Sequence, residues 1–417
     1  MVEEEGSSAH DPYAALRNPE YRWFIASMGL VTLGLQMQGV VVGWQVYART
    51  GDPLALGLVG LSEALPFLVV ALFGGHAADR LNRLHLCMVS TLSLAFCSAL
   101  LLAFTWRSLS GPLATAVAPI YGIIFLTGIV RAFYRPANVA LGTDLLPKEH
   151  YANGSTWRVS VFHSGMVIGP AIGGLVYAWK GPVVAHALVM ALLLTGFLGL
   201  LPIHYVPKPI KPREGSIFAS LGEGLRFVFS QRLLLSAISL DLFAVLFGGA
   251  VAVLPVFAKE VLKTGPQGLG LLRAAPAVGS VLMGLTMAHL PPLRRAGRTL
   301  LFCVAGFGVA TIAFALSRSF LLSLLMLAAS GAMDNVSVVL RATLLQNLTP
   351  EHMLGRVSSV NQVFIGSSNE IGAFESGLAA RFMGLIPSVV FGGCMTLLVV
   401  AFTTWKVPEL RKMDRIG

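Results

Sequence analysis

The sequence predicts an all-α membrane protein in which twelve transmembrane helices form two pseudo-symmetric six-helix bundles. Of its 417 residues, 55% are hydrophobic and only 12% are Asp, Glu, Lys or Arg. Soluble globular proteins carry about 25% charged residues, so this chain has too little charge to cover a water-exposed surface. Twelve long apolar runs and a repeat between the two halves of the chain complete the prediction.

Each apolar run is long enough to cross a bilayer, because a spanning helix needs about 20 mostly apolar residues. The alternating pattern typical of membrane β-barrels is absent from these runs. The expected spans are, in order, 23–48, 54–78, 84–106, 113–141, 156–179, 183–205, 233–258, 267–290, 299–317, 319–345, 357–380 and 386–405.

One long polar segment, 206–232, lies between the sixth and seventh spans and divides the chain into three expected parts. These are an N-terminal bundle over 1–205, a cytoplasmic linker, and a C-terminal bundle over 233–417. Prolines at the start of the linker favour an extended chain. Its second part is predicted to form an amphipathic helix that lies on the membrane surface. The apolar face of that helix holds Ile217, Leu221, Leu225 and Val228.

The distribution of basic residues predicts that both termini and the linker are cytoplasmic. With the N-terminus inside, the cytoplasmic segments hold nineteen Lys and Arg residues and the outer loops hold seven. Cytoplasmic loops of membrane proteins carry such an excess. The net charge of +10 is therefore mostly an orientation signal, and no nucleic-acid partner is expected.

A repeat relates the two halves of the chain. The segment 128–147 matches 331–350 at an offset of 203 residues. The same offset also pairs Gly174 with Gly377. Earlier in the chain, the segment 53–58 matches 266–271 at an offset of 213, which pairs Gly57 with Gly270. Two homologous six-helix halves are the plan of many secondary transporters, whose substrates bind near the bilayer midplane between the halves.

Polar residues inside the spans mark a central path, because charged groups are costly at membrane depth and usually face water or a partner. Spans 3, 6, 9 and 12 hold no Asp, Glu, Lys or Arg in their interiors, so we expect these four to face lipid. The other eight would surround the path. Polar side chains well inside those eight spans include Gln36, Glu63, Arg131, Arg135, His163, Asp241, Arg273, Asp334, Arg341, Glu370 and Glu375.

Several of these residues also have a purely structural interpretation. Glu63 can pair with a neighbouring arginine. Arg135, Arg273 and Arg341 lie toward span ends, where snorkelling to the interface is the simpler interpretation. Arg131 and Asp334 occupy the same place in the two repeats with opposite charge, which fits an ion pair and a functional pair equally well.

Carboxylates in the path are the candidates for proton coupling. A carboxylate near an arginine can exchange a proton when its surroundings change. We expect the coupling proton at Asp334 or Glu370, both near the middle of path-facing spans, with Asp241 as the reserve candidate.

A short charged motif follows the second span and reads Gly75-His-Ala-Ala-Asp79-Arg80-Leu-Asn82-Arg83. It resembles the loop signature of the major facilitator superfamily, G-x-x-x-D-R-x-G-R, with Asn82 in place of the second Gly. The resemblance covers the whole chain, since that superfamily also has twelve spans and a central cytoplasmic loop. It implies the major facilitator fold and a secondary transporter.

The same resemblance implies a cytoplasmic gate. The loop aspartate, Asp79, would meet the second half near Arg356 or the start of the eleventh span. The loop arginine, Arg83, would meet Asp144 at the end of the fourth span. Such a latch would close the cytoplasmic side and would break when cargo enters from the cytoplasm.

The fifth span carries a second motif, Gly165-Met-Val-Ile-Gly169-Pro170-Ala-Ile-Gly173-Gly174. It resembles the antiporter signature of drug-exporting members, although a further Gly expected nine residues upstream is Thr156. Small residues let helices approach closely, and a proline bends a span. A generic helix contact is the alternative interpretation of this motif.

The segments 128–137 and 345–357 resemble the enterobactin-exporter branch of the superfamily, which implies export across a bacterial inner membrane. The expected function is proton-coupled efflux of an amphipathic small organic molecule, siderophore-like or drug-like, by alternating access. A lipid or lysolipid transporter, a non-transporting receptor and an importer on the same fold are the alternatives.

No enzymatic activity is expected, and the glycine loop with Lys and Ser or Thr that binds ATP is absent from the sequence. The four cysteines lie apart inside apolar runs, where we expect small buried side chains and neither disulfides nor metal ligands. No cofactor or metal is expected. The expected partners are a small-molecule substrate, protons and the lipid bilayer, and the chain is expected to be a monomer.

Overall fold

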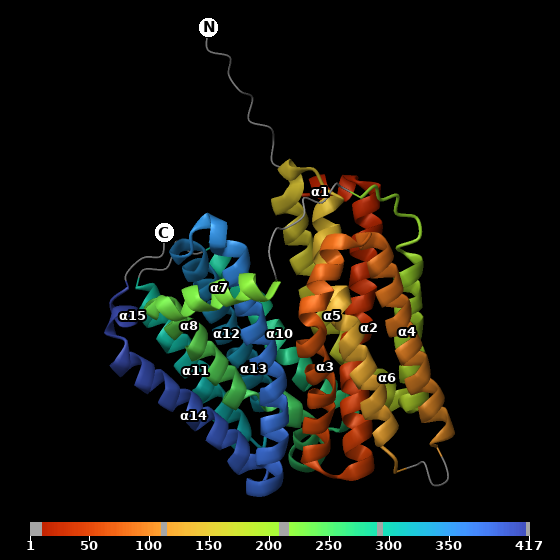
Figure 1. Cartoon of the computed structure of the whole chain (residues 1–417). Coiled ribbons are helices and arrows are strands. Elements are labelled where there is room, and N and C mark those ends of the chain that lie inside the picture. Colours follow the sequence, from red (N-terminus) through yellow and green to blue (C-terminus); the bar gives the residue numbers. More distant parts are fainter. Residues whose placement is uncertain (1–10, 110–114, 208–216, 290–294, 414–417) are drawn as a thin grey trace.

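The computed structural model describes residues 11–109, 115–207, 217–289 and 295–413. The regular structure of these ranges is helical, which confirms the all-α prediction. We call the end of the molecule that carries α1 (Ala14–Arg17) and α15 (Pro408–Lys412) the terminus end, and the opposite end the distal end (Figure 1).

The first half contains six spans in five long helices. The fifth and sixth spans are two segments of α6, 151–180 and 182–198, which are separated at Gly181 by a φ of 80° that glycine adopts readily. The bounds are α2 (Pro19–Thr50), α3 (Pro53–Arg80), α4 (Arg83–Arg107), α5 (Ala118–Asp144) and α6 (Tyr151–Leu198), with a 3-10 turn at Lys148–His150.

The second half begins after α7 (Ile217–Ser230), and its first span is interrupted. α8 (Arg232–Gly248) ends at two glycines and continues through η2 (Ala250–Val253), α9 (Leu254–Val256) and the π-helical η3 (Phe257–Val261). The remaining elements are α10 (Gly265–His289), α11 (Ala296–Leu316), α12 (Phe320–Leu348), η4 (Glu351–Met353), α13 (Leu354–Met383) and α14 (Leu385–Lys406).

Local capping fixes the start of the first span and the tight turn between the first and second spans. The Asn18 side chain accepts a hydrogen bond from the Glu20 backbone N–H at 2.9 Å, and Pro19 occupies the first helical position of α2. Gly51 ends α2 with a φ of 61°, in the left-handed conformation that favours glycine. The Asp52 carboxylate then caps α3 by accepting from the Leu54 N–H at 2.9 Å.

The described helices provide the twelve predicted spans. Nine described stretches are long and apolar enough to cross a membrane, and one of them, Lys148–Leu198, contains both segments of α6. α5 and α13 add helices of 27 and 30 residues whose ionisable side chains lower their hydropathy. The sixth span ends at Leu198 and not at the expected residue 205, because irregular turns follow it.

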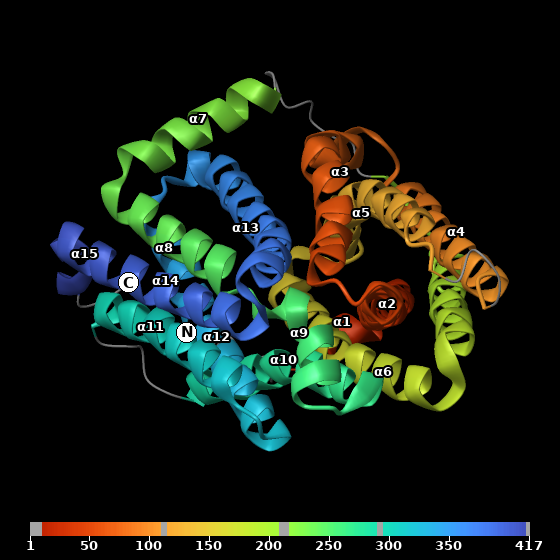
Figure 2. The same cartoon turned by 90° about the horizontal axis from the view of Figure 1, so that it is seen from below.

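The helices without charged interiors lie at the periphery. Figure 2 places α4 toward one side of the molecule and α11 and α14 toward the other, and their main packing partners belong to their own half. Large apolar side chains cover these helices: Phe96, Phe302 and Phe402 are 62%, 76% and 60% exposed. Such a surface fits acyl chains. Cys394 on α14 is also exposed, so the expectation that all four cysteines are buried is wrong for this residue.

The two halves touch at the distal end and diverge toward the terminus end (Figure 1). α3 packs on α13, and α6 packs on α10. Backbone lies against backbone where Gly57 faces Gly377 and where Gly174 faces Gly270, all near the distal ends of their helical segments. We call these two contacts the distal seal.

Candidate functional site

An ion pair lies about halfway along two spans of the first half. Arg131 is the central residue of α5, thirteen residues from each end, and its guanidinium pairs with Glu63 of α3. Gly128, one turn earlier, lets the two backbones approach, since a Cβ there would collide with the Glu63 carbonyl. Arg131 is therefore the neighbouring arginine with which Glu63 was expected to be able to pair.

A denser group, the carboxylate–arginine cluster, lies in the second half and consists of Asp241, Asp334 and Arg341. Asp241 on α8 pairs with Arg341 on α12, and these side chains are only 9% and 8% exposed. Asp334 lies seven residues before Arg341 on the same helix face. The charges of both Asp241 and Arg341 act on it. Arg341 Nε also donates to Ser337 Oγ at 3.2 Å, so its side chain runs back toward Asp334.

The Asp241–Arg341 contact corrects one expectation. Arg341 does not snorkel, because the buried carboxylate of Asp241 holds it inside the protein. Arg131, the counterpart of Asp334 in the repeat, pairs in this conformation with Glu63 of its own half. Asp334 is the midpoint of α12, fourteen residues from each end. The side chain of Glu370, the other expected proton carrier, lies outside the described part of the chain.

The signature motif forms the tight connection between α3 and α4 at the terminus end. Asn82, which replaces the family's glycine, has a φ of −60° and caps α4 by accepting from the His85 N–H at 3.1 Å. The backbone is therefore not in the left-handed conformation that favours glycine, and asparagine fits at this position. Arg83 pairs with Asp144, as the resemblance implies, and its Nε donates to the Ala78 carbonyl at 3.2 Å.

Tyr205, which follows the sixth span, completes this cluster. Its hydroxyl donates to the Asp144 carboxylate at 2.7 Å. Burial and this hydrogen bond raise the pKa of Tyr205 to about 12. The phenol therefore stays a neutral donor at physiological pH. The Arg83, Asp144 and Tyr205 contacts tie three parts of the first half together.

The other gate residues occupy the ends of α3 and α13. Asp79 and Arg80 are in the last turn of α3, and Gly75 lies one turn earlier. Arg356, in the first turn of α13, pairs with Glu223 of α7 at 2.5 Å. The predicted contact between Asp79 and Arg356 stays a prediction for the state in which the terminus end is closed.

The glycine motif of α6 has two packing faces. The first face holds Gly165, Gly169 and Gly173, four residues apart, and it lies against α2. A Cβ on Gly169 would approach the Leu33 carbonyl to 2.9 Å and the Gln36 Cβ to 2.8 Å. The path residue Gln36 therefore lies at the contact between α2 and α6. Small residues at this spacing allow close helix packing in membranes.

The second face of the motif crosses to the other half. A Cβ on Gly174 would lie 2.9 Å from the Gly270 Cα, and a Cβ on Gly270 would collide with the Pro170 carbonyl. At the equivalent contact, a Cβ on Gly377 would lie 2.9 Å from the Gly57 Cα. The motif is thus both a generic helix contact within the first half and part of the distal seal.

Polar contacts reinforce the distal seal. Asp52 at the start of α3 pairs with Arg381 at the end of α13. Arg273 of α10 donates to the Gly39 carbonyl of α2 at 3.3 Å, so this arginine binds the opposite half and does not snorkel as expected. These partners could not be assigned from the sequence, because they depend on which helices meet across the interface.

A buried polar chain in the first half was not predicted. His186 in the second segment of α6 is fully buried, and its Nε2 lies 2.9 Å from Gln45 Oε1. The Gln45 amide donates to Thr105 Oγ1 at 3.0 Å. The three side chains therefore form one connected chain of polar contacts inside the first half. The sequence signals were a histidine well inside the sixth span and a glutamine, Gln45, in the first.

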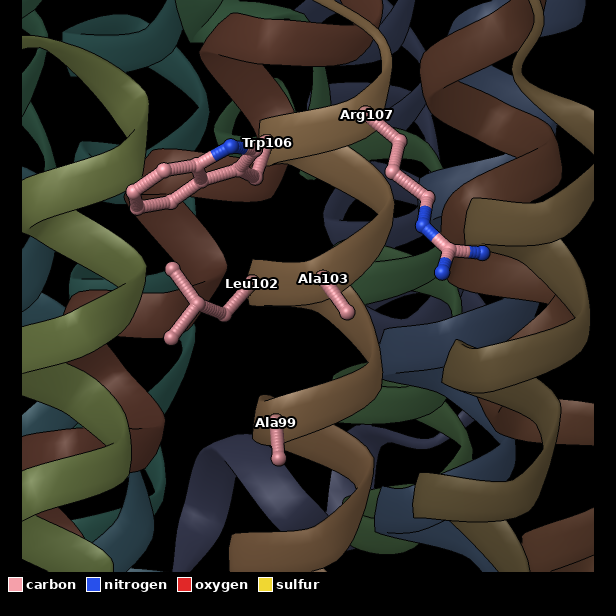
Figure 3. A pocket seen from close by; sticks show the side chains of 5 residues that line it. All are labelled: Ala99, Leu102, Ala103, Trp106 and Arg107. Carbon is pink, nitrogen blue, oxygen red and sulfur yellow. The ribbon is translucent and has the colours of Figure 1, made fainter.

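A groove on α4 faces away from these groups. Figure 3 shows its lining residues, Ala99, Leu102, Ala103, Trp106 and Arg107, and its volume is about 290 Å³. Trp106 is 67% exposed. Tryptophan is typical of the boundary between acyl chains and water. We therefore assign this groove to the lipid-facing surface and not to the transport path.

Comparisons with known proteins agree with this architecture. A family model described as "Transmembrane secretion effector" matches residues 10–416. The enterobactin exporter EntS of Escherichia coli O81 (strain ED1a) is 27% identical over 402 residues, which cover 95% of this chain and 93% of the relative. The exporter of the same name from Escherichia fergusonii shows the same identity and coverage.

Solved transporter structures share the fold. The POT family transporter PepTSo superposes with a TM-score of 0.73 at 12% identity, covering 95% of this chain and 99% of that one. The D-xylose-proton symporter superposes with a TM-score of 0.69 at 15% identity and the same coverages. Because the family match spans almost the whole chain, the protein belongs to the transmembrane secretion effector family of the major facilitator superfamily and is a multi-pass membrane transporter.

Proposed function

We propose that the protein exports an amphipathic small organic molecule, siderophore-like or drug-like, from a bacterial cytoplasm in exchange for protons. The similarity to the enterobactin exporter supports export and this class of cargo. The excess of basic residues supports a cytoplasmic location for both termini in the inner membrane. With this orientation, the terminus end is the side from which cargo enters.

The observation that carries the proton-coupling proposal is the carboxylate–arginine cluster. Arg341 neutralises one carboxylate, Asp241, and a second carboxylate, Asp334, lies two turns before Arg341 on the same helix. A second negative charge at membrane depth needs its own compensation, which a proton supplies. The cluster would hold a proton at Asp334 in one conformation and release it when the conformation and the access of water change.

The arrangement of the halves supports alternating access. The distal seal closes one side, and the helices diverge toward the other (Figure 1). The cluster lies entirely in the second half, and the Glu63–Arg131 pair lies entirely in the first. Rocking of one half against the other would therefore change the surroundings of both groups without breaking either ion pair.

The test is transport by the purified protein in vesicles with an imposed proton gradient, with enterobactin as the first probe followed by amphipathic drugs. The wild-type protein should move protons only when cargo is present. Asp334→Asn should still bind cargo and lose proton movement. Glu409→Gln, which alters an exposed carboxylate at the terminus end, is the matched control and should retain both activities.

Two further variants identify the proton carrier. Asp241→Asn and Glu370→Gln are measured beside Asp334→Asn under the same gradient. If all three variants retain coupling, the proton proposal is wrong. Movement of cargo only toward the cytoplasm, or of lysolipid alone, would replace the export proposal by the corresponding alternative.

A further inference from the structure

α7 lies across the spans at the terminus end, at the edge of the second half (Figures 1 and 2). Its main partners are α13 and α8. Gly224 and Val228, four residues apart, form its packed face. Val228 is fully buried, and a Cβ on Gly224 would lie 2.9 Å from the Arg356 carbonyl oxygen. Residues at this spacing share one side of a helix, so α7 is attached along a single face.

A second face of α7 is apolar and exposed. Leu225 and Phe229, again four residues apart, are 40% and 59% exposed. Arg226 lies next to them and is exposed as well. The face therefore combines two large apolar side chains with a cation, which is the composition of helices that lie in a membrane interface.

The depth of α7 follows from its connection to α14. Arg232, two residues after the end of α7, donates to the Lys406 carbonyl at 2.9 Å. Lys406 is the last residue of α14, and its neighbour Trp405 is 76% exposed. Tryptophan at the end of a span marks the boundary between acyl chains and water. The C-terminal end of α7 therefore lies at this boundary.

The surroundings of α7 carry an excess of positive charge. Its acid Glu223 is paired with Arg356, and Glu409 of α15 is paired with Arg232. Further exposed cations lie on α7, α14 and α15, namely Arg226, Lys406, Arg411 and Lys412. Basic clusters at the ends of spans attract the anionic headgroups of a membrane. Charge complementarity thus indicates a bilayer that contains anionic lipid.

We propose that the exposed face of α7 binds anionic phospholipid, with Leu225 and Phe229 among the acyl chains and Arg226 at the phosphate layer. Because Glu223 of the same helix holds Arg356, the bound lipid also fixes the first turn of α13. This surface goes beyond the proposed transport activity, and it depends neither on the cargo nor on the coupling ion.

Spin labels at Leu225→Cys and Phe229→Cys, placed singly with Cys394→Ser, test the position of this face. In vesicles of phosphatidylcholine and phosphatidylglycerol, both labels should be more accessible to oxygen, which concentrates among acyl chains, than to a water-soluble nickel reagent. A label at Glu149→Cys, an exposed site at the terminus end, should show the opposite. High nickel access at both α7 sites overturns the proposal. Protection from both reagents would indicate a protein cover, such as a second copy of the chain, and would overturn it too.

Lipid titrations followed by thermal unfolding test the charge preference. Phosphatidylglycerol should stabilise the detergent-purified protein more than phosphatidylcholine does. Arg226→Gln should weaken the apparent affinity for phosphatidylglycerol about fivefold, the factor expected for one arginine at an anionic surface. Arg17→Gln, which alters a 79% exposed arginine in the first half, is the matched control and should not change it. Equal stabilisation by both lipids, or equal effects of the two variants, would refute anionic lipid as the ligand.

Discussion

The side chain of Arg341 is buried, although its position in the sequence indicated that it would reach the membrane interface. It lies seven residues from the end of α12, within reach of the interface, yet its side chain is buried beside Asp241. An arginine is stable at this depth only with an anionic partner. Asp334 provides a second potential partner on the same helix, so the three residues should respond to substitution as a group.

We expect substitution of Arg341 to destabilise the protein more than substitution of its ion-pair partner Asp241. Arg341→Gln leaves two carboxylates without their cation and should reduce the unfolding free energy by about 3 kcal/mol. Asp241→Asn should cost clearly less, because Asp334 can take its place beside Arg341. Thermal and chemical unfolding of the two variants in the same detergent measures the difference. Equal losses would show that Asp334 does not share the arginine.

We expect the contribution of Tyr205 to protein stability to depend on pH. Its pKa rises from 10.0 to about 12 on folding, so its stabilising effect is complete below pH 10 and is lost as the pH rises through 12. Tyr205→Phe should reduce stability by about 1 kcal/mol at neutral pH, and its deficit relative to wild type should shrink above pH 10. Melting temperatures across pH measure this, with Tyr13→Phe as the exposed control. A deficit independent of pH would contradict the assignment.

At the scale of elements, the distal seal consists of two helix contacts that are related by the internal repeat. Gly57 and Gly270 are equivalent in the repeat, and so are Gly174 and Gly377. The contact of α3 with α13 therefore corresponds to that of α10 with α6. In both, backbone meets backbone because the glycines lack side chains, which brings the two halves together over a short length of helix.

A methyl group in the seal should favour the opposite conformation. Gly377→Ala places a Cβ against the α3 backbone, so the distal contact should loosen and the terminus end should close. Distances between spin labels at Leu81→Cys and Glu351→Cys, one in each half, should become shorter. Gly122→Ala, where nothing lies within 4 Å of the added Cβ, is the matched control on α5 and should leave the distances unchanged. Identical distance distributions for the two variants would count against the seal.

At the scale of the whole molecule, the two ends are built differently. The distal end is closed by close backbone contact and reinforced by the Asp52–Arg381 pair. The terminus end is lined by loop charges, and α7 holds Arg356 through Glu223. Closing the terminus end would bring the end of α3 toward the start of α13. Asp79 would then compete with Glu223 for Arg356.

Removal of the Asp79 charge should therefore act in the opposite direction to Gly377→Ala. Asp79→Asn should increase the population with long distances between the same two labels and should slow turnover. Asp11→Asn, at the same end of the first half, serves as the control. An unchanged distribution together with normal transport would rule out the latch.

The orientation of the molecule is a separate prediction. The charge distribution predicts that both termini are cytoplasmic. A fluorescent protein fused to the C-terminus should fluoresce in living bacteria, and an alkaline phosphatase fusion at the same point should be inactive. A cysteine at Lys180→Cys, in the distal turn of α6, should react with an impermeant thiol reagent added outside. The reverse pattern would invert the direction assigned to transport.

The sequence by itself determined the fold class, the number of spans and the family resemblance. Each span is an apolar run whose helicity is required by the absence of water in the bilayer core, so neighbours are not needed to recognise it. The Arg83–Asp144 contact was also accessible, because the loop signature that carries Arg83 implies its partner at the end of the fourth span.

Only the tertiary structure decided which polar side chains are partners. Arg341 and Arg273 were expected to snorkel, yet they contact Asp241 and Gly39. In this conformation Arg356 pairs with Glu223, a partner that the sequence did not indicate. The period of a helix shows which residues share a face, but it does not show which face of another helix lies opposite. Which helix faces meet depends on close backbone contacts between segments far apart in the sequence. One such contact joins Gly57 and Gly377, which are more than three hundred residues apart. The choice is made by packing across the whole molecule, because the shapes of both halves must fit at the same time.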